Sequence, residues 1–346
     1  MEKIRLAIVG TGSIAFTHMY GLQRIDEAEL VAICDIHTEQ MDAFRKTFPM
    51  PDEDCYTDLA ELLKRDDIDA VIICASDKAH HDITVRSLRA GKHVLCEKPM
   101  ALDVDECRDM IKTAEETGKK LMIGQVCRKA PGFIKAKELV DAGAIGEIFF
   151  VESEYAHDYC ELPGIDNWRK VPERHPIIGG GCHAVDLLRW IAGDPYEVFA
   201  YANHKMLPGW PINDTVVSVL KFPGDVIGKV FTSIGCKRNY TMRTVIYGSE
   251  GTIITDNTSD TISLFRNKVA GELETFGTPN QVIETKIPVE IASHNMAEEI
   301  RDFCNCLIKD IPADPDGKQG FKTVAVCDAI VRSARDGEKV EIDYSI

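Results

Sequence analysis

The chain has 346 residues, of which 45% are hydrophobic, and a formal net charge of −16 at pH 7. This length suffices for two domains with cores of their own, and the negative charge argues against nucleic acid or an anionic membrane surface as a partner. No apolar signal-peptide core opens the sequence, and no apolar run approaches the ~20 residues of a membrane helix, so we expect a cytoplasmic protein. The 12 cysteines are scattered, and we expect them to be reduced.

The first predicted strand covers residues 4–9 and is mostly apolar, as in a parallel sheet that is buried on both faces. The turn after it reads Gly10-Thr11-Gly12-Ser13-Ile14-Ala15, the pattern G-x-G-x-x-A. Gly10 permits a tight exit from the strand, and Gly12 lets the backbone approach a pyrophosphate. A helix that begins at about Ser13 would direct its unpaired amides at the phosphates. The turn therefore predicts a dinucleotide site that residues 10–14 form.

A second predicted strand, residues 29–34, ends in Asp35, near the position at which a carboxylate should bind the adenosine ribose. A 2′-phosphate about 4 Å from Asp35 would meet a repulsion of up to ~4 kcal/mol at an effective dielectric near 20. No Lys or Arg occurs in residues 36–40 to relieve it, so the sequence favours NAD over NADP. The alternative is that Asp35 only caps a helix.

Strands and helices keep alternating up to residue 124. We expect helices at 38–48, 58–65, 78–90 and 104–117, and strands at 68–74, 93–96 and 120–124. This order predicts a doubly wound parallel sheet in a first domain, residues 1–125. Ligands of such sheets bind beyond the carboxyl ends of the strands, so Ser76, Glu97, Lys98 and Gln125 should share one crevice with the glycine-rich turn.

The pattern changes after Gln125, where longer strands follow one another. We expect helices at 132–142, 182–192, 295–309 and 318–335, and strands at 147–157, 196–205, 214–222, 226–235 and 240–247. These elements predict a second domain, residues 126–346, with a large, mostly antiparallel open sheet. The predicted fold class is α/β, with an N-terminal Rossmann domain and a C-terminal α+β domain.

Lys98 lies between Glu97 and Pro99 at the predicted carboxyl edge, where a substrate would meet a nicotinamide; on spacing alone it could equally be a surface lysine. Together, several motifs resemble the glucose-fructose oxidoreductase / inositol dehydrogenase / MocA (Gfo/Idh/MocA) family, and the similarity runs over essentially the whole chain. These motifs are Gly10-Thr11-Gly12, Asp35, Glu97-Lys98-Pro99, Gly146, Trp168-Arg169, Gly181-Cys182-His183-Ala184-Val185-Asp186-Leu187-Leu188-Arg189-Trp190 and Tyr247-Gly248-Ser249-Glu250-Gly251-Thr252.

The resemblance implies an NAD(P)-binding Rossmann domain, a C-terminal domain whose open sheet forms dimers or tetramers, and sugar or cyclitol substrates that are oxidised at a ring carbinol. Lys98 and His183 match the active-site lysine and histidine of the family. A hydride leaves a carbinol only as the hydroxyl proton is removed, so we expect His183 to act as general base and Lys98 to stabilise the oxygen. The two roles could be reversed. Further expected contacts are His80, Trp168 and Arg169 with the cofactor, and Arg128, Tyr155 and His157 with the substrate.

One position departs from the family pattern. Many relatives have an aspartate four residues before the histidine, whereas this chain has Gly179 there. His157, Asp158, His175 and Asp186 are the substitutes that we consider. We expect no metal, because the spacing of the histidines, the cysteines and Asp158 between residues 157 and 183 fits no standard zinc pattern, and the chemistry that the resemblance implies needs no metal.

We therefore expect an NAD-dependent oxidoreductase that acts on a secondary hydroxyl or ketone of a sugar, glycoside or cyclitol. One alternative is a glycosidase or lyase of the same fold that retains NAD and cleaves its substrate through transient oxidation. The other is a regulator that senses NAD without catalysis.

Overall fold

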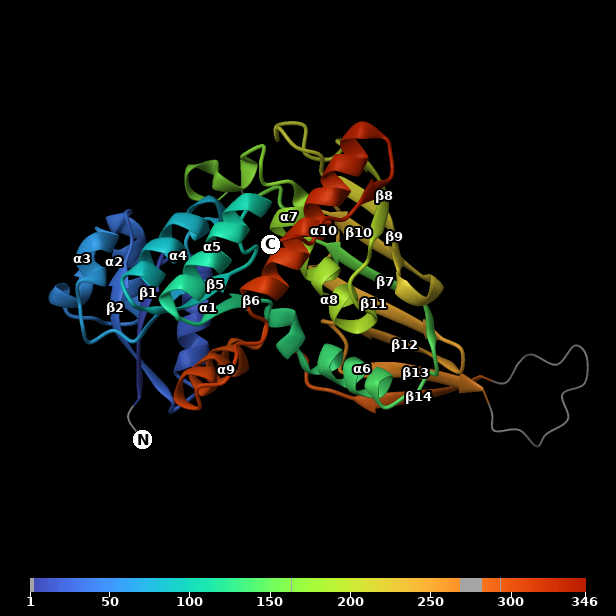
Figure 1. The fold of residues 1–346 in the computed structure, drawn as a ribbon, viewed down its shortest axis with the longest axis horizontal. Coiled ribbons are helices and arrows are strands. Elements are labelled where there is room, and N and C mark those ends of the chain that lie inside the picture. The colour runs from blue at the N-terminus through green and yellow to red at the C-terminus, as the bar shows by residue number, and fades with distance from the viewer. Residues whose placement is uncertain (1–2, 163, 268–281, 293) are drawn as a thin grey trace, which may run out of the picture. The chain divides into compact units, whose positions relative to one another are not determined.

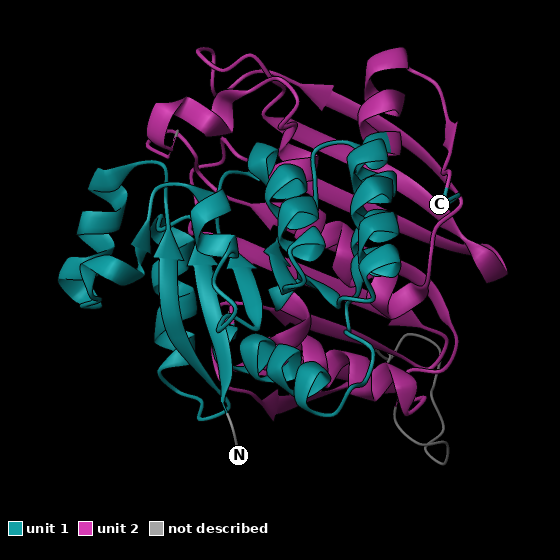
Figure 2. Ribbon diagram, turned by 60° about the vertical axis from the view of Figure 1, so that its left-hand side comes forward, with its two compact units in different colours: residues 1–126, 295–328, 344–346 teal, residues 127–294, 329–343 magenta. Residues whose placement is uncertain are grey.

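The computed structural model describes residues 3–162, 164–267, 282–292 and 294–346. The chain divides into two compact units, which Figure 2 colours separately. Unit 1 comprises residues 1–126, 295–328 and 344–346, and unit 2 comprises residues 127–294 and 329–343. The predicted boundary after residue 125 lies within one residue of the first division. The prediction that residues 126–346 form one domain differs from this division, because residues 295–328 belong to unit 1.

Unit 1 contains a six-stranded sheet in which every pairing is parallel. Its strand order is β3-β2-β1-β4-β5-β6, the order of a dinucleotide-binding fold, which confirms the predicted doubly wound sheet (Figure 1). The strands are β1 (Ile4–Val9), β2 (Ala28–Cys34), β3 (Cys55–Tyr56), β4 (Ala70–Ile73), β5 (His93–Glu97) and β6 (Leu121–Gly124).

The helices of unit 1 alternate with these strands along the chain. They are α1 (Ser13–Leu22), α2 (Thr38–Thr47), α3 (Leu59–Leu63), α4 (His80–Arg89) and α5 (Val104–Thr117). Helix α5 has the bounds that the sequence predicts, because both of its ends carry local signals. The Asp103 side chain accepts from the amides of Asp105 and Glu106, and Gly118 ends the helix with φ +64°.

Helix α9 (Met296–Ile308) explains why a late segment of the chain belongs to unit 1. Its side chains Ile300, Phe303 and Cys304 are buried in the same core as Leu6 and Ile8 of β1. A Cβ atom on Gly21 of α1 would lie 2.8 Å from the Met296 side chain, so the glycine permits the two helices to approach closely. This packing joins distant parts of the sequence, and no local pattern predicts it.

Unit 2 contains a nine-stranded sheet in the order β14-β13-β12-β11-β7-β10-β9-β8-β15. Only the pair β7 and β10 is parallel, so the predicted mostly antiparallel sheet is confirmed. The strands are β7 (Ile148–Ala156), β8 (Glu197–Asn203), β9 (Thr215–Phe222), β10 (Val226–Ser233), β11 (Thr241–Gly248), β12 (Gly251–Asp256), β13 (Thr261–Asn267), β14 (Val282–Pro288) and β15 (Val340–Glu341). The last four strands were not predicted.

The helices in this part of the chain are α6 (Pro131–Asp141), α7 (Pro176–Gly179), α8 (Cys182–Ala192) and α10 (Gly317–Asp336), whose residues fall in both units. Helix α8 packs on β7, β10 and β11, and α6 packs on β12 and β13. Burial alternates along β9, where Val216 and Leu220 are buried while Val217 and Val219 are exposed. The sheet therefore has one covered face and one face that leaves apolar side chains exposed.

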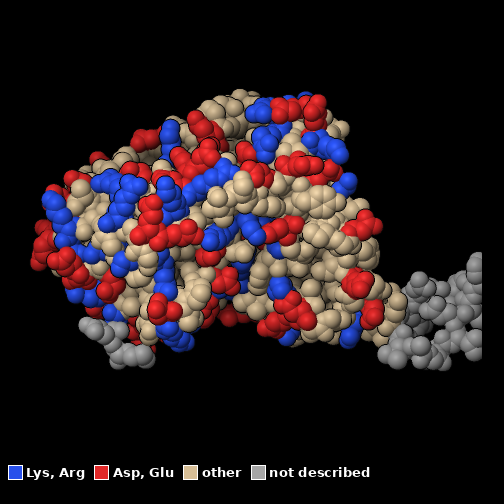
Figure 3. Space-filling view, viewed as in Figure 1, with Lys and Arg blue, Asp and Glu red and all other residues tan. Residues whose placement is uncertain are grey.

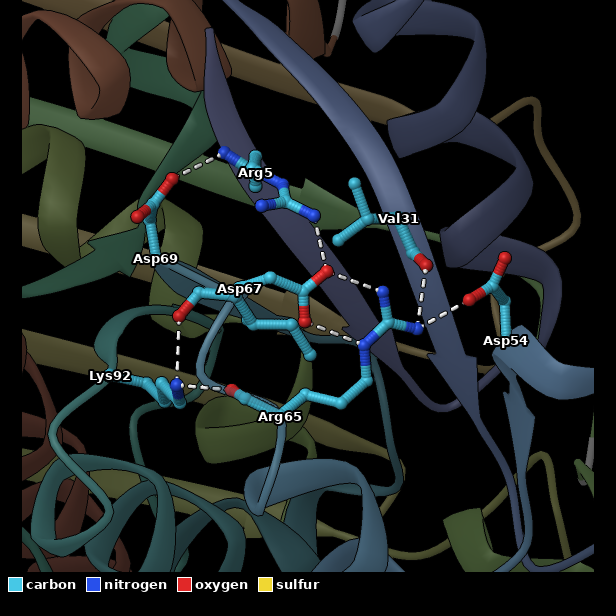
Figure 4. A network of polar contacts seen from close by, with 8 residues as sticks. Arg5, Val31, Asp54, Arg65, Asp67, Asp69 and Lys92 are labelled. Carbon is cyan, nitrogen blue, oxygen red and sulfur yellow. Dashed lines mark hydrogen bonds and ion pairs between the residues drawn. The ribbon is translucent and has the colours of Figure 1, made fainter.

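Charged side chains are interspersed on the face of the molecule that Figure 3 shows, where acidic and basic groups alternate without one large patch of either sign. Among the described residues, no helix is long and apolar enough to cross a membrane. At the amino ends of β1, β4 and β5, a polar network ties unit 1 together (Figure 4): Arg65 binds Asp54 and Asp67, and Lys92 donates to the Arg65 and Ile68 carbonyls. This edge lies opposite the carboxyl ends that the sequence assigns to ligand binding.

Candidate active site

The glycine-rich turn has the local geometry that a dinucleotide requires. Gly10 has φ +89°, and a Cβ atom there would lie 2.5 Å from the Ala75 nitrogen, so only glycine fits between β1 and β4. At Gly12, the residue before α1, no described atom lies within 4 Å of the corresponding position. The turn is thus closed on the protein side and open at the helix N-terminus, where a pyrophosphate would bind.

Asp35 is joined directly to this turn. Its Oδ2 accepts from the Thr11 amide at 2.6 Å and from the Thr11 hydroxyl at 2.9 Å, and its Oδ1 accepts from the His37 amide at 2.9 Å. Helix α2 begins after His37, so Asp35 supports the start of α2 through the His37 amide as well as the glycine-rich turn through Thr11. The carboxylate therefore fixes the turn and remains half-buried at the end of β2.

His80 and Gln125 flank the carboxyl ends of β4 and β6. Both ring nitrogens of the buried His80 face carbonyl oxygens, of Pro99 at 2.8 Å and of Ala75 at 3.2 Å. Burial lowers the pKa of His80, but Cys96 and the other polar neighbours outweigh it and raise that pKa to about 9. The Oε1 atom of Gln125 is buried and has no hydrogen-bond partner among the described residues. Such an acceptor fits a ligand that brings its own donor, as the nicotinamide carboxamide does.

Glu97 positions the backbone of Lys98. Its Oε1 lies 2.8 Å from His18 Nε2, and its Oε2 accepts from the Lys98 amide at 3.1 Å. Burial raises the pKa of Glu97, but His18 and the nearby Lys98 charge outweigh it and lower that pKa to about 2. The Glu97 carboxylate is therefore committed to protein groups, and its expected contact with the cofactor stays a prediction. The Lys98 side chain is half-buried.

In unit 2, His183 is the second residue of α8 and is 2% exposed. Its Nδ1 lies 3.1 Å from the Sγ atom of Cys127, in the 3-10 turn Val126–Lys129. The Tyr155 ring stacks on the imidazole with ring centroids 6.3 Å apart. Cys127 therefore contacts the histidine that relatives pair with an aspartate.

The Arg174 side chain lies beside Gly179, the position at which many relatives carry an aspartate. A Cβ atom there would lie 2.3 Å from the guanidinium carbon of Arg174, a buried side chain that donates to the Gly179 carbonyl at 3.1 Å. Both oxygens of Asp186, one of the substitutes that we considered, bind Arg128 at 2.7 Å. Arg128 is thereby engaged in a buried ion pair, and its expected contact with substrate stays a prediction.

The other proposed substitutes have partners or surroundings of their own. Asp158 binds Lys237 at 2.7 Å, and burial lowers the pKa of His175 to about 4. His157 lies 3.4 Å from the Tyr155 hydroxyl and packs against the rings of Tyr159 and Tyr240. The structure thus brings Tyr155 and His157 into one aromatic cluster with Tyr159, His183, Tyr240 and His294.

Trp168 and Arg169 lie in the irregular turn Ile165–Lys170. The Trp168 ring is contacted by two guanidinium groups, of Arg169 at 4.3 Å and of Arg174 at 4.8 Å. These contacts hold the turn, while the expected contact of both residues with the cofactor stays a prediction.

Sequence reasoning missed Cys127, Tyr240 and His294 of unit 2 and His18 of unit 1. One signal was available for Cys127, which directly precedes Arg128 and follows closely on the carboxyl end of β6. No local signal marks His294, which is joined to the cluster only by the fold.

The parallel sheet, its glycine-rich turn and the carboxylate after β2 define a dinucleotide-dependent oxidoreductase of two-unit construction. The family model described as "Oxidoreductase family, NAD-binding Rossmann fold" matches residues 4–125, and that of the Gfo/Idh/MocA C-terminal domain matches residues 133–254. The chain therefore belongs to the Gfo/Idh/MocA family, as its motifs predicted, and unit 1 carries an NAD-binding domain.

Several known proteins are similar over nearly the full length. Inositol 2-dehydrogenase/D-chiro-inositol 3-dehydrogenase of Lactiplantibacillus plantarum is 25% identical, over 98% of this chain and 94% of the relative. D-apiose dehydrogenase of Paraburkholderia graminis is also 25% identical, over 99% and 90%. Levoglucosan dehydrogenase in complex with NADH and L-sorbose has the same fold, with a TM-score of 0.87 and 20% identity over 99% of this chain and 100% of that structure.

Proposed function

We propose that the protein is an NAD-dependent dehydrogenase that oxidises a secondary ring hydroxyl of a sugar, glycoside or cyclitol, or reduces the matching ketone. One observation carries the proposal: both residues that match the family's active site are positioned by buried partners, Lys98 by Glu97 and His183 by Cys127. The names of the relatives, inositol and apiose dehydrogenases, support this substrate class.

The residues of unit 1 that would hold NAD are the glycine-rich turn at the pyrophosphate, Asp35 at the adenosine ribose and Gln125 near the nicotinamide. Bound NAD would supply the hydride acceptor. An open position beside Gly12, the buried free acceptor on Gln125 and the half-buried carboxylate of Asp35 all fit such a ligand.

The protein's own groups would handle the proton. For His183 to accept it at Nε2, Nδ1 must carry a hydrogen, which the Cys127 sulfur would accept. Lys98 would orient the hydroxyl and stabilise the negative charge that develops on its oxygen. Tyr240, which is half-buried, carries an aromatic ring of the kind that sugar rings pack against.

We also propose that the protein is a homo-oligomer, a dimer or tetramer, that associates through the exposed face of the nine-stranded sheet. Tyr201, 72% exposed, lies beside Val217 in the register of β8 and β9, and Val219 is 49% exposed two residues further on. Apolar side chains on one flat face favour burial against a second copy. Sedimentation equilibrium tests this proposal: a monomer at micromolar concentration would refute it.

The catalytic proposal is tested by absorbance in the NADH band while purified protein and NAD are offered a panel of inositols, sugars and glycosides. We expect NADH to accumulate with at least one member of the panel and the Lys98→Ala variant to lose that activity. Accumulation that persists in Lys98→Ala would refute the assigned site. Product release without NADH would instead favour the redox-assisted glycosidase, and NAD binding without turnover of any substrate would favour the regulator.

A further inference from the structure

We propose that Cys127, His183 and His294 of unit 2 form a zinc site. Their donor atoms, one sulfur and two imidazole nitrogens, all lie within 4.8 Å of one another. Three separate segments supply them: the turn after β6, the first turn of α8 and the residues before α9. Tetrahedral zinc with Zn–S near ~2.3 Å and Zn–N near ~2.0 Å places neighbouring donors roughly 3.3 to 3.6 Å apart. The Cys127 sulfur and the His183 Nδ1 atom, 3.1 Å apart, are already near this spacing, while the third donor lies within 4.8 Å of both.

The donor set suits zinc chemically. A thiolate and two imidazoles are the borderline-soft ligands that zinc prefers, and three protein ligands with an open fourth position are typical of catalytic zinc. Cys127 and His183 are almost fully buried, whereas His294 is half-buried, so the open position would face the His294 side. One thiolate and two neutral imidazoles leave a net charge of about +1 on the zinc complex, which favours a hydroxyl or alkoxide oxygen as the fourth ligand.

Aromatic rings hold both imidazoles in place. The Tyr155 ring stacks on His183 with an interplanar angle of 23°, and the Tyr240 ring stacks on His294 at 20° with centroids 5.8 Å apart. The Met242 sulfur lies 3.3 Å from the Cys127 sulfur and adds to the soft surroundings.

A second group of potential ligands, His18, Glu97 and Glu299 of unit 1, has donor atoms equally close together but does not support the same inference. All three side chains are buried, and Glu97 already binds His18 and the Lys98 amide. That group offers no open side for a fourth ligand.

The sequence-based expectation of no metal rested on the chemistry that the family resemblance implies and on the spacing of residues 157–183, which contain only one of these three ligands. If zinc binds the Nδ1 atom of His183, this imidazole is a metal ligand, and the proton transfer to His183 described above would not apply. This consequence rests on the proposed dehydrogenase function, whereas zinc binding itself does not.

The test is the zinc content of the full-length protein, loaded with excess zinc, passed through a chelating resin and analysed by mass spectrometry of the metal. We expect about one zinc per chain in the wild type, as three protein ligands predict. Cys127→Ser and His294→Asn should each weaken zinc binding at least ~100-fold, because loss of an outer-shell group alone costs about 10- to 100-fold. Cys182→Ser, which changes the buried thiol next to His183, should retain the metal.

Cobalt substitution gives a second readout that needs neither NAD nor substrate. A thiolate-to-cobalt charge-transfer band should appear in the wild type and in Cys182→Ser and be absent from Cys127→Ser. Circular dichroism checks that each variant is folded, and His294→Asn, at a half-buried position, carries the test if Cys127→Ser does not fold. The proposal would be overturned if the wild-type protein held no zinc, or held copper in its place. It would also be overturned if both Cys127→Ser and His294→Asn retained zinc. These outcomes do not depend on the dehydrogenase assay.

Discussion

Replacing Asp35 with asparagine tests the origin of the expected preference for NAD over NADP. Asparagine keeps an oxygen that can accept from the Thr11 amide, now at 2.6 Å, but removes the negative charge. A 2′-phosphate about 4 Å away would be repelled by up to ~4 kcal/mol at an effective dielectric near 20. Because Asp35 is half-buried and water screens the pair, we halve this figure to about 2 kcal/mol, which corresponds to a factor of roughly 30 in affinity.

Calorimetric titration with NAD and NADP measures the effect directly. Asp35→Asn should tighten NADP binding by up to about 30-fold, and weaken NAD binding by about 10-fold because a charge-assisted hydrogen bond to the ribose is lost. Raising the salt concentration should shrink the gain for NADP. Glu39→Gln, an exposed carboxylate in the first turn of α2, is the matched control and should leave both affinities unchanged. An unchanged ratio of the two affinities in Asp35→Asn, or an equal change in the control, would refute the electrostatic reasoning.

Three further predictions concern individual positions. Gly10→Ala should lower the melting temperature, because its Cβ would meet a backbone nitrogen at 2.5 Å, whereas Gly12→Ala should leave stability unchanged and weaken NAD binding; equal melting temperatures would contradict this contrast. Gly179→Asp, which restores the family residue, should be tolerated with a loss of less than ~2 kcal/mol in a urea titration, because its Cβ would meet only the movable end of the Arg174 side chain and its carboxylate can pair with that guanidinium; a larger loss would refute this. Burial lowers the pKa of His175 from 6.5 to about 4. As the pH falls from about 6.5 to 4, His175 is therefore protonated in the unfolded chain but not in the folded one, and up to ~3 kcal/mol of the free energy of unfolding is lost in that window. His175→Gln should flatten the loss, and an unchanged slope would contradict the assignment.

Elements with strong local signals were predicted from the sequence with the correct bounds. Helix α8 (Cys182–Ala192) has the predicted ends, because a glycine run precedes it, its apolar residues follow the helical period and Gly193 ends it with φ +88°. The glycine-rich turn and Asp35 were likewise predictable, since the dinucleotide site requires these residues at this spacing.

Features that depend on contacts between distant segments were not predictable. Strand β15 has two residues and is a strand only because it pairs with β8. Strands β12 to β14 were overlooked, although their 6 or 7 residues include β-branched side chains that favour strands. The place of α9 in the core of unit 1 depends on its packing against α1 and β1. The contact between Cys127 and His183 was not predictable for the same reason. The two residues meet only because α8 packs against the turn after β6.

Hydride transfer itself is the central claim, and a substrate deuterated at the reacting carbon tests it most directly. The protein, NAD and the deuterated sugar or cyclitol that proves active in the panel are mixed in stoichiometric amounts, and the reduced cofactor is analysed by mass spectrometry. Our account predicts that deuterium appears in the reduced cofactor and that the deuterated cofactor accumulates together with the ketone. Neither product should form with the Lys98→Ala variant. Deuterium that returns to a cleaved product, or reduced cofactor that carries none, would contradict it.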